Sequence, residues 1–407
     1  MKRLCKIGAG VAVFSILPIL TWILLSKILG DDRIANVFSI TYGLQFLYAI
    51  IKYLFGSGAN VRKEKKNDVN SIYNGMLIGG IVTVVVFSLL IIFADRYILF
   101  FGQDPEFYLI YVRYGMGLIG AQTLLSFVVE KLYFDDKENV ANMHLFGFNI
   151  LAFGSAIILS MILPNTAKAL YASLMMCVLY IVVLYIWQFR KFKLDFKFYE
   201  NIRYVSSELT SAFFLLIIYI FGYRNAFSAG GEYILALNLV SLCTDTQWDM
   251  FEAIATATRV DIAKGRFKYR NMVKNAYIFC TLLVVSSVVM TAIMTVTSEV
   301  IFNLVVIYLV VQVIDMIRYT YVVILATYTQ LEYSLTKNTI IKVFAELIRT
   351  ILSVVIVSPF CTDIGQLASA GVLFLGYVIL RISRYQVKDG VLTVKGRDEP
   401  VMNPQNA

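Results

Sequence analysis

The chain has 407 residues, of which 59% are hydrophobic and only 15% are charged, and its formal net charge is +9. A mean hydropathy of +0.73 excludes an ordinary soluble protein, in which about 25% of residues are charged. The excess positive charge could indicate a nucleic-acid partner, but it lies in short loops between apolar segments, so we expect none.

Apolar segments recur along the chain, each close to the roughly 20 residues that cross a bilayer. We therefore predict an all-α polytopic membrane protein with about twelve transmembrane helices. In chain order these spans are residues 7–29, 34–56, 72–94, 107–130, 142–163, 167–189, 204–223, 232–256, 275–297, 302–327, 338–358 and 366–383.

Basic residues gather in alternate loops, among them residues 62–66, 190–203 and 259–274. Because loops rich in Lys and Arg stay on the cytoplasmic side, we predict that these loops and both termini are cytoplasmic. We expect a monomeric, multi-pass protein of the cell membrane, in bacteria the inner membrane.

The two halves of the chain resemble each other. Residues 34–37 open a span that ends at residues 58–60 and a basic loop, and residues 235–238 and 259–261 repeat this about 200 positions later. The other interpretation is that any two apolar segments look alike. We expect a six-helix bundle at residues 1–189, a cytoplasmic connector at 190–203, a second bundle at 204–385 and a short, mobile cytoplasmic tail at 386–407.

Three segments resemble the multidrug and toxic compound extrusion (MATE) family of transporters. Phe101–Glu106 with Tyr111–Tyr114 resembles the start of its fourth span, Gly56–Asn60 the end of its second, and Gly231–Asn238 the start of its eighth. The resemblance covers roughly residues 1–385. It implies a V-shaped pair of six-helix bundles around a central cavity, with cation-coupled antiport as the usual activity.

The chain departs from that family at two acidic positions. Many bacterial members carry a carboxylate in span one after a proline, but here no carboxylate follows Pro18 before Asp31. A glutamate found in the middle of span seven in some branches is replaced by residues 213–216, which are Phe-Phe-Leu-Leu. Coupling to a cation would therefore use other positions.

Span eight offers such positions, because Asp245, Asp249 and Glu252 are spaced by four and three residues and share one helical face. Ionised groups inside a membrane usually face a cavity or a partner. We predict a cation, proton or substrate site here, with Gln247 and Trp248 lining the cavity. The alternatives are a solvated face near one end of the helix and a structural pairing with Arg318.

Span ten contributes Gln312, Asp315 and Arg318. Asp315 and Arg318 are three residues apart, so they either pair with each other or bring Asp315 into the site and Arg318 and Gln312 into the cavity wall. We interpret Glu346 and Arg349 of span eleven as a structural pair. Glu130 and Glu208 are left out of the site because they are predicted to lie near the cytoplasmic interface.

These observations predict a secondary transporter, an antiporter that exports an organic, cationic or amphipathic solute against protons or sodium by alternating access. Multidrug or xenobiotic efflux is the corresponding role. We expect no enzymatic activity, no catalytic residues, no bound metal and no cofactor besides the transported ion. The alternatives are a lipid-linked saccharide flippase, which would need a basic cavity, and a scaffold or receptor that transports nothing.

Overall fold

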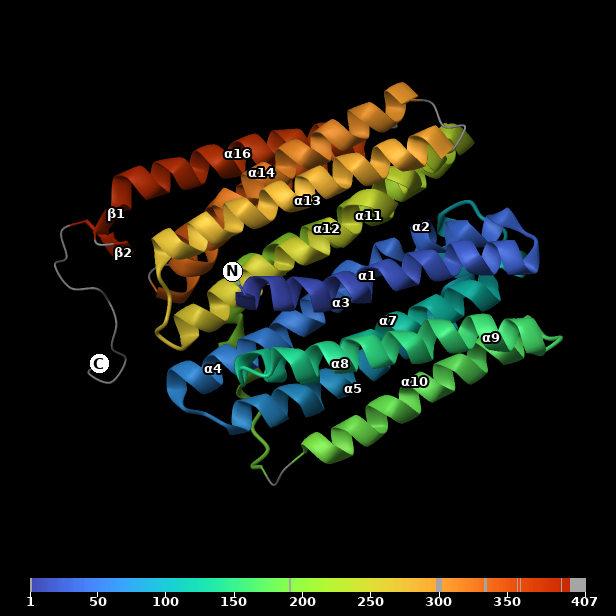
Figure 1. Ribbon diagram of the computed structural model, residues 1–407, viewed down its shortest axis with the longest axis horizontal. Coiled ribbons are helices and arrows are strands. Elements are labelled where there is room, and N and C mark those ends of the chain that lie inside the picture. The colour runs from blue at the N-terminus through green and yellow to red at the C-terminus, as the bar shows by residue number, and fades with distance from the viewer. Residues whose placement is uncertain are drawn as a thin grey trace.

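The protein is almost entirely helical in the computed structural model, which describes residues 2–189, 192–297, 302–332, 335–356, 358, 360–388 and 390–395. Long helices lie side by side along one axis of the molecule (Figure 1). This arrangement confirms the predicted all-α polytopic class. One small β-hairpin follows the last helix.

The first half of the chain contains six long helical segments, several of them interrupted. They are α1 (Lys2–Leu29); η1 (Asp32–Asn36), α2 (Val37–Tyr42), α3 (Leu44–Ile51), η2 (Lys52–Ser57) and α4 (Gly58–Lys66); α5 (Asn70–Ile92) with the short α6 (Ala94–Phe100); α7 (Pro105–Phe134); α8 (Glu138–Asn149), η3 (Ile150–Gly154) and α9 (Ser155–Ile162); and α10 (Thr166–Gln188).

In its described residues, the second half contains six more helices, which are less interrupted. They are η4 (Lys197–Asn201) with α11 (Ile202–Ala229), α12 (Gly231–Ala263), α13 (Tyr269–Thr297), α14 (Phe302–Glu332), α15 (Leu335–Val355) and α16 (Cys361–Arg384), followed by strands β1 (Tyr385–Lys388) and β2 (Val391–Val394).

Each predicted span overlaps one of these helical segments. Among the described residues, eight helices are long and apolar enough to cross a membrane, and a ninth segment joins Asp32–Tyr42 to Leu44–Lys66 through a bend of 41°. The three other predicted spans correspond to α1, α12 and α15. Helices α12 and α15 are more polar because they carry charged residues of the central cavity, described below.

The second span changes its helical geometry twice. It begins as a 3₁₀ turn, bends at Gly43, and passes through a π-helical turn, η2, before ending as α4. A Cβ at Gly43 would lie 2.7 Å from Cγ1 of Ile220 on α11, so only a glycine allows the two helices to approach this closely. The bend therefore lies at a contact between the two halves of the chain.

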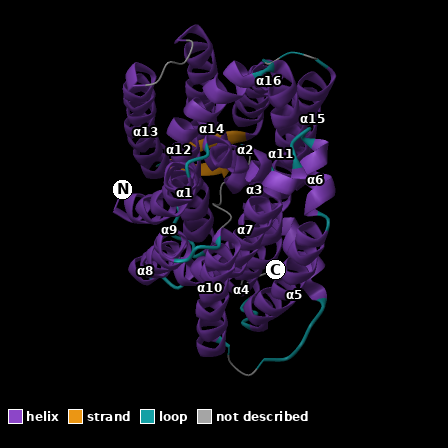
Figure 2. Ribbon diagram, turned by 90° about the vertical axis from the view of Figure 1, so that its right-hand side faces the viewer, coloured by secondary structure: helices purple, strands orange, loops and turns teal. Residues whose placement is uncertain are grey.

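The helices form two groups, α1–α10 and α11–α16 (Figure 1). Viewed from the end, α13, α14 and α16 lie on one side, α5, α8 and α10 lie on the other, and α1, α3, α11 and α12 lie between them (Figure 2). The groups meet where α1 packs along α12 and where α3 packs on α11.

Charged residues from both groups form a cluster at the end of the molecule where α1 begins. Arg3 of α1 donates to Asp261 of α12 at 3.0 Å and to Asp136, after α7, at 2.7 Å. Lys264 and Arg266, which follow α12, also pair with Asp136, at 2.7 and 2.9 Å. This end cluster, Arg3, Asp136, Asp261, Lys264 and Arg266, ties the two groups together.

The described part of the connector, residues 192–203, is hydrogen-bonded to the first group. The amide of Asn74 on α5 donates to the carbonyl of Lys193 at 3.0 Å and accepts from the backbone N–H of Asp195 at 3.0 Å. Arg62 of α4 donates to the carbonyl of Lys197 at 2.7 Å. Asn201, which is buried, donates to the carbonyl of Leu54 at 3.0 Å.

The prediction of a mobile tail from Gln386 is wrong for its first residues. Strands β1 and β2 pair as an antiparallel hairpin, and Tyr385 and Leu392 are buried. The Tyr328 hydroxyl on α14 donates to the carbonyl of Leu392 at 2.6 Å. The hairpin is ordered because its apolar face packs on α13 and α14, a tertiary contact with no signature in the local sequence. Residues 396–407 lie outside the described part of the chain.

Candidate functional site

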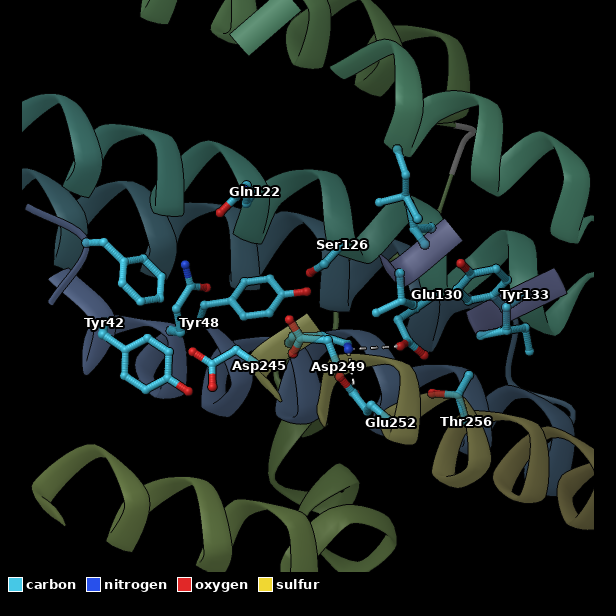
Figure 3. Close-up of a pocket in the computed structure, with 17 residues that line it drawn as sticks. Tyr42, Tyr48, Gln122, Ser126, Glu130, Tyr133, Asp245, Asp249, Glu252 and Thr256 are labelled. Atoms are coloured by element: carbon cyan, nitrogen blue, oxygen red, sulfur yellow. Dashed lines mark hydrogen bonds and ion pairs between the residues drawn. The ribbon is translucent and has the colours of Figure 1, made fainter. Parts of the chain in front are cut away.

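The three acidic residues of α12 lie together on the wall of a central space between the two helix groups. Asp245, Asp249 and Glu252 line two adjoining cavities, so the acidic face of α12 belongs to both of them. Figure 3 shows the three carboxylates following one face of the helix. All three carboxylates therefore face the space between the two helix groups.

The first cavity lies mainly on the side of the first helix group and has ≈ 890 Å³ of space between its walls. Its lining comes from α1, α2, α3, η2, α7, α8 and α12. Besides the three acids, its polar and aromatic residues are Phe38, Tyr42, Gln45, Tyr48, Lys52, Gln122, Ser126, Glu130, Tyr133 and Thr256.

The second cavity lies against the second helix group and is larger, with ≈ 1250 Å³ of space. It is lined by α2, α3, η2, α11, α12, α14, α15 and α16. In addition to the residues that it shares with the first cavity, its polar and aromatic residues are Phe46, Tyr53, Glu208, Ser211, Tyr219, Trp248, Asp315, Arg318, Tyr319, Lys342, Glu346, Arg349 and Gln366.

The acids of α12 have different surroundings. Asp245 is half-buried, the Tyr42 hydroxyl points toward its carboxylate (Figure 3), and its Oδ2 has no hydrogen-bond partner. Asp249 is exposed to the space of the cavities. Glu252 is paired through Oε1 with the ammonium of Lys52 at 2.6 Å. Along one face of α12, the carboxylate of Asp249 is therefore exposed to the cavities, whereas that of Glu252 is ion-paired.

The predicted site did not include Lys52. It also did not include Glu130, the second carboxylate near the Lys52 ammonium. Lys52 Nζ lies 3.7 Å from Glu130 Oε1, and Glu130 is only 2% exposed. The prediction that Glu130 stays in contact with water at the interface is therefore wrong. A signal for Lys52 was present, since a lysine inside a predicted span is itself a functional indication.

Asp315 is paired with Arg318 and also lines the second cavity, so both interpretations of this residue apply. Arg318 Nε donates to Asp315 Oδ1 at 2.8 Å, and Gln366 Nε2 donates to Asp315 Oδ2 at 2.6 Å. Gln366 also donates to Gln312 Oε1 at 3.3 Å, and Trp248 Nε1 donates to the same oxygen at 2.7 Å. The prediction that Gln312 lines the cavity is wrong, because neither cavity includes it. Gln312 lies behind the wall and holds Trp248 and Gln366 in position.

The expectation that Gln247 lines the cavity is wrong. Its amide nitrogen is directed toward α13, where Ser286 Oγ lies at 3.3 Å and Met290 Sδ at 3.5 Å, and neither cavity includes it. Residues two apart on a helix lie on different faces, so Gln247 points away from the face that Asp245 and Asp249 share.

The second cavity also contains charged residues of α15. Lys342 Nζ donates to Ser211 Oγ at 2.9 Å, and the same hydroxyl donates to Glu346 Oε1 at 3.1 Å. The Arg349 guanidinium lies 6.0 Å from the ring centre of Tyr219 on α11. Glu346 and Arg349, interpreted from the sequence as a structural pair, both face the cavity instead.

Glu208 of α11 is another cavity residue that the sequence interpretation left out. Its Oε1 accepts a hydrogen bond at 2.9 Å from Arg259, whose side chain is 0% exposed. Burying an arginine is costly unless it is paired, so this contact explains why a charged residue near the end of α12 lies inside the protein.

Acidic groups outnumber basic groups around the two cavities. Among the residues that the structure describes, seven carboxylates line them, against four basic side chains. The carboxylates are Glu130, Glu208, Asp245, Asp249, Glu252, Asp315 and Glu346, and the bases are Lys52, Arg318, Lys342 and Arg349. The described residues contain no cluster that could hold a metal ion. The arrangement favours cationic occupants over anionic ones.

Comparisons with known proteins identify the fold. No family model matches the sequence, and no curated protein matches it either. Solved structures do match. One of MATE in complex with MaD3S has a TM-score of 0.69 at 14% identity, and the match covers 94% of this chain and 95% of that chain.

Two other matches cover 94% of this chain and 96% of the other chain. One, at 16% identity and a TM-score of 0.68, is an outward-facing multidrug resistance MATE family transporter of the MOP superfamily. The other, at 15% identity and a TM-score of 0.68, is a MOP superfamily transporter from Pyrococcus furiosus Vc1, described as having a binding pocket of reverse polarity. The chain therefore has the MATE fold, as its motifs predicted.

Proposed function

We propose that this chain, which has the MATE fold, is a secondary active transporter that moves an organic cation or amphipathic solute across the membrane in exchange for protons or sodium. The observation that carries the proposal is the acidic face of α12. Asp245, Asp249 and Glu252 line both cavities at the contact between the two helix groups. A cation bound there would interact with both groups at once.

The acidic face suits a coupling site for an electrostatic reason. Carboxylates that share a face in a poorly hydrated space repel one another, which favours uptake of a proton or another cation by at least one of them. Because neighbouring acids titrate as a set, the site is assigned to the group of three rather than to a single residue. Asp315 lies in the adjoining second cavity, but its pairing with Arg318 leaves it a lesser role.

The aromatic walls support an organic solute. Tyr42 and Tyr48 line both cavities, and Tyr219, Trp248 and Tyr319 line the second. Aromatic faces attract cations and also provide apolar contact area. Together with the excess of carboxylates, they favour solutes that carry a positive charge on an apolar body.

Transport would follow from rocking of the two helix groups about the cavities. We propose that residues 1–189 and 204–385 are the moving units and that residues 190–203 connect them. Because loops rich in Lys and Arg are retained in the cytoplasm, we expect both termini and the connector to lie there. Because one chain supplies the lining of both cavities, we propose that the protein acts as a monomer in the cell membrane.

A lipid-linked saccharide flippase is the second candidate, because four basic side chains do line the cavities. Pyrophosphate recognition needs bases that are available to the ligand. Two of the four are instead ion-paired, Arg318 with Asp315 and Lys52 with Glu252. This pairing makes the cation transporter the better-supported function.

The test is reconstitution of the full chain into liposomes, with proton and sodium gradients imposed separately. Ethidium and tetraphenylphosphonium serve as organic cations, and calcein serves as an anionic control. We expect one of the two gradients to drive movement of the organic cations but not of calcein. Equal rates with and without either gradient would refute cation coupling, and gradient-independent movement of a pyrophosphate-linked lipid would favour the flippase.

A further inference from the structure

We propose that Lys52 is a tethered cation that competes with the transported cation for Glu252 and transfers to Glu130 when that cation arrives. This inference deepens the proposed function and rests on it. It assigns a role to a lysine that lies outside the acidic face, and it explains how ion binding would alter the contact between the two helix groups.

The geometry places one ammonium group between carboxylates of different helix groups. Lys52 Nζ is 2.6 Å from Oε1 of Glu252, on α12, and 3.7 Å from Oε1 of Glu130, on α7. Figure 3 shows the side chains of Glu130 and Glu252 converging on the same space from their two helices. The pair with Glu252 joins the two groups, whereas a pair with Glu130 would stay within the first group.

The charges around Lys52 leave room for one more cation. Two carboxylates share one ammonium, and Glu130 Oε2 is buried without a hydrogen-bond partner. A buried, unpartnered carboxylate oxygen is costly. When a proton or sodium ion neutralises Glu252, the ammonium therefore has a ready acceptor on Glu130.

The surroundings of Lys52 support two positions of the ammonium rather than one. Its Nζ lies 5.7 Å from the ring centre of Tyr48 and 5.5 Å from that of Tyr53, and such rings stabilise a cation along its path. The other charged residues nearby are Asp249 and Arg259 of α12, and Arg259 is paired with Glu208. The ion-pair partner of Glu252 is therefore Lys52 and not Arg259.

The backbone at Lys52 is unusual as well. Lys52 begins the π-helical turn η2, and such turns are frequent at functional sites. The backbone of η2 packs closely on α5, because a Cβ at Gly75 would lie 2.2 Å from the carbonyl oxygen of Phe55. We therefore assign the proposed movement to the lysine side chain.

In the proposed sequence of events, Lys52 stays on Glu252 while the site holds no transported cation, and this ion pair holds the two groups in one arrangement. A proton or sodium ion that binds Glu252 displaces the ammonium, which remains protonated and moves to Glu130. This one link between the groups is then broken, which favours their rocking.

The test measures cation affinity without the unknown solute, on the purified full chain in detergent. Sodium binding is followed with ²²Na⁺ at constant ionic strength, and proton binding by the pH midpoint of thermal stabilisation in sodium-free buffer. Comparison of the two measurements shows whether the site binds sodium or protons. Removing the competitor with Lys52→Gln should tighten cation binding roughly tenfold, because a neighbouring charge shifts ion affinity by at least that factor.

Glu130→Gln should weaken cation binding by a similar factor, because the displaced ammonium loses its alternative acceptor. Lys52→Arg keeps a tethered cation and should behave more like the wild type. Lys27→Gln is the matched control, since Lys27 belongs to an exposed pair with Asp32 and should shift nothing. If Glu130→Gln does not fold, Glu130→Asp should shift the affinity in the same direction by less.

The double variant separates this mechanism from simple electrostatics. If Glu130 acts by accepting Lys52, replacing Glu130 in a Lys52→Gln background should have little further effect, so the two changes are not additive. Additive effects, or shifts in the same direction, would overturn the role of Lys52 while leaving the proposed function intact. A wild type that binds neither ion would instead refute cation coupling, and this inference with it.

Discussion

Arg3 Nη1 donates to Asp261 Oδ1 at 3.0 Å, so the beginning of the first helix is tied to the end of the eighth span, 258 residues away. The same guanidinium reaches Asp136 of its own helix group at 2.7 Å. One arginine thus holds both helix groups at this end of the molecule. The two groups must separate here if this end of the cavity opens.

Replacing Arg3 with Ala should loosen this end of the molecule. The change removes charged hydrogen bonds to both groups, at a cost of about 2 kcal/mol. Spin labels at Asn139 and Lys268, which are exposed on either side of the end cluster, should report a longer and broader distance distribution. Arg33→Ala, which breaks an exposed pair with Asp31 elsewhere, is the control, and an unchanged distribution in Arg3→Ala would contradict the prediction.

Asp136 should continue to stabilise the folded state in mildly acidic solution. The Arg266 guanidinium, together with Lys264, holds the pKa of Asp136 well below its usual range. A carboxylate with a lowered pKa stabilises the folded state above its unfolded-state pKa of about 3.9, and loses this contribution only as the pH falls toward the lowered value.

The measurement is the difference in thermal midpoint between the wild type and Asp136→Asn, because other titrating groups cancel in it. This difference should be constant from pH 8 to pH 5 and should shrink only below about pH 4. A difference that already declines between pH 7 and pH 5 would show that the pKa of Asp136 is not lowered.

Asp249 offers the most direct test of coupling. It lies one turn from both Asp245 and Glu252 and is exposed to the cavities. Asp249→Asn keeps the shape of the side chain but removes its charge, so gradient-driven transport should fall at least tenfold, while membrane insertion and solute binding persist. Asp32→Asn, in an exposed pair with Lys27, should have little effect. Unchanged ion dependence in Asp249→Asn would return the acidic face to a structural role.

The predicted topology can be tested by labelling cysteines in intact cells. The native Cys5 is exposed and is first replaced by Ser. A cysteine at Ser228, at the end of α11, should react with an impermeant thiol reagent, and one at Lys268 should not, because the basic loop is retained in the cytoplasm. Both positions are exposed in the structure, so equal labelling would contradict the assigned orientation rather than report burial.

Much of the fold could be predicted from the sequence because a bilayer imposes a length on each apolar helix. The acidic face could be predicted as well, since Asp245, Asp249 and Glu252 belong to one helix and their spacing fixes their common direction. The same rule could have excluded Gln247, two residues from Asp245.

The rest of the site depends on contacts between helices, which spacing within one helix does not report. Nothing in the local sequence places Lys52 against Glu252, 200 residues away, or brings Lys342 to Ser211 of α11. Glu130 was misjudged for a related reason. Its position near the end of a predicted span suggested contact with water, but α7 continues to Phe134, so Glu130 lies a turn inside the helix.

The hydrogen bonds of the connector determine where the two helix groups can pivot. Residues 193–197 are fastened to α4 and α5, and Asn201 is fastened to Leu54, so this stretch moves with the first group and supplies no slack. Helix α11 then starts directly at Ile202. In the proposed rocking motion, the second group would therefore move relative to the connector at the junction between Asn201 and Ile202, so that the start of α11 would act as a hinge.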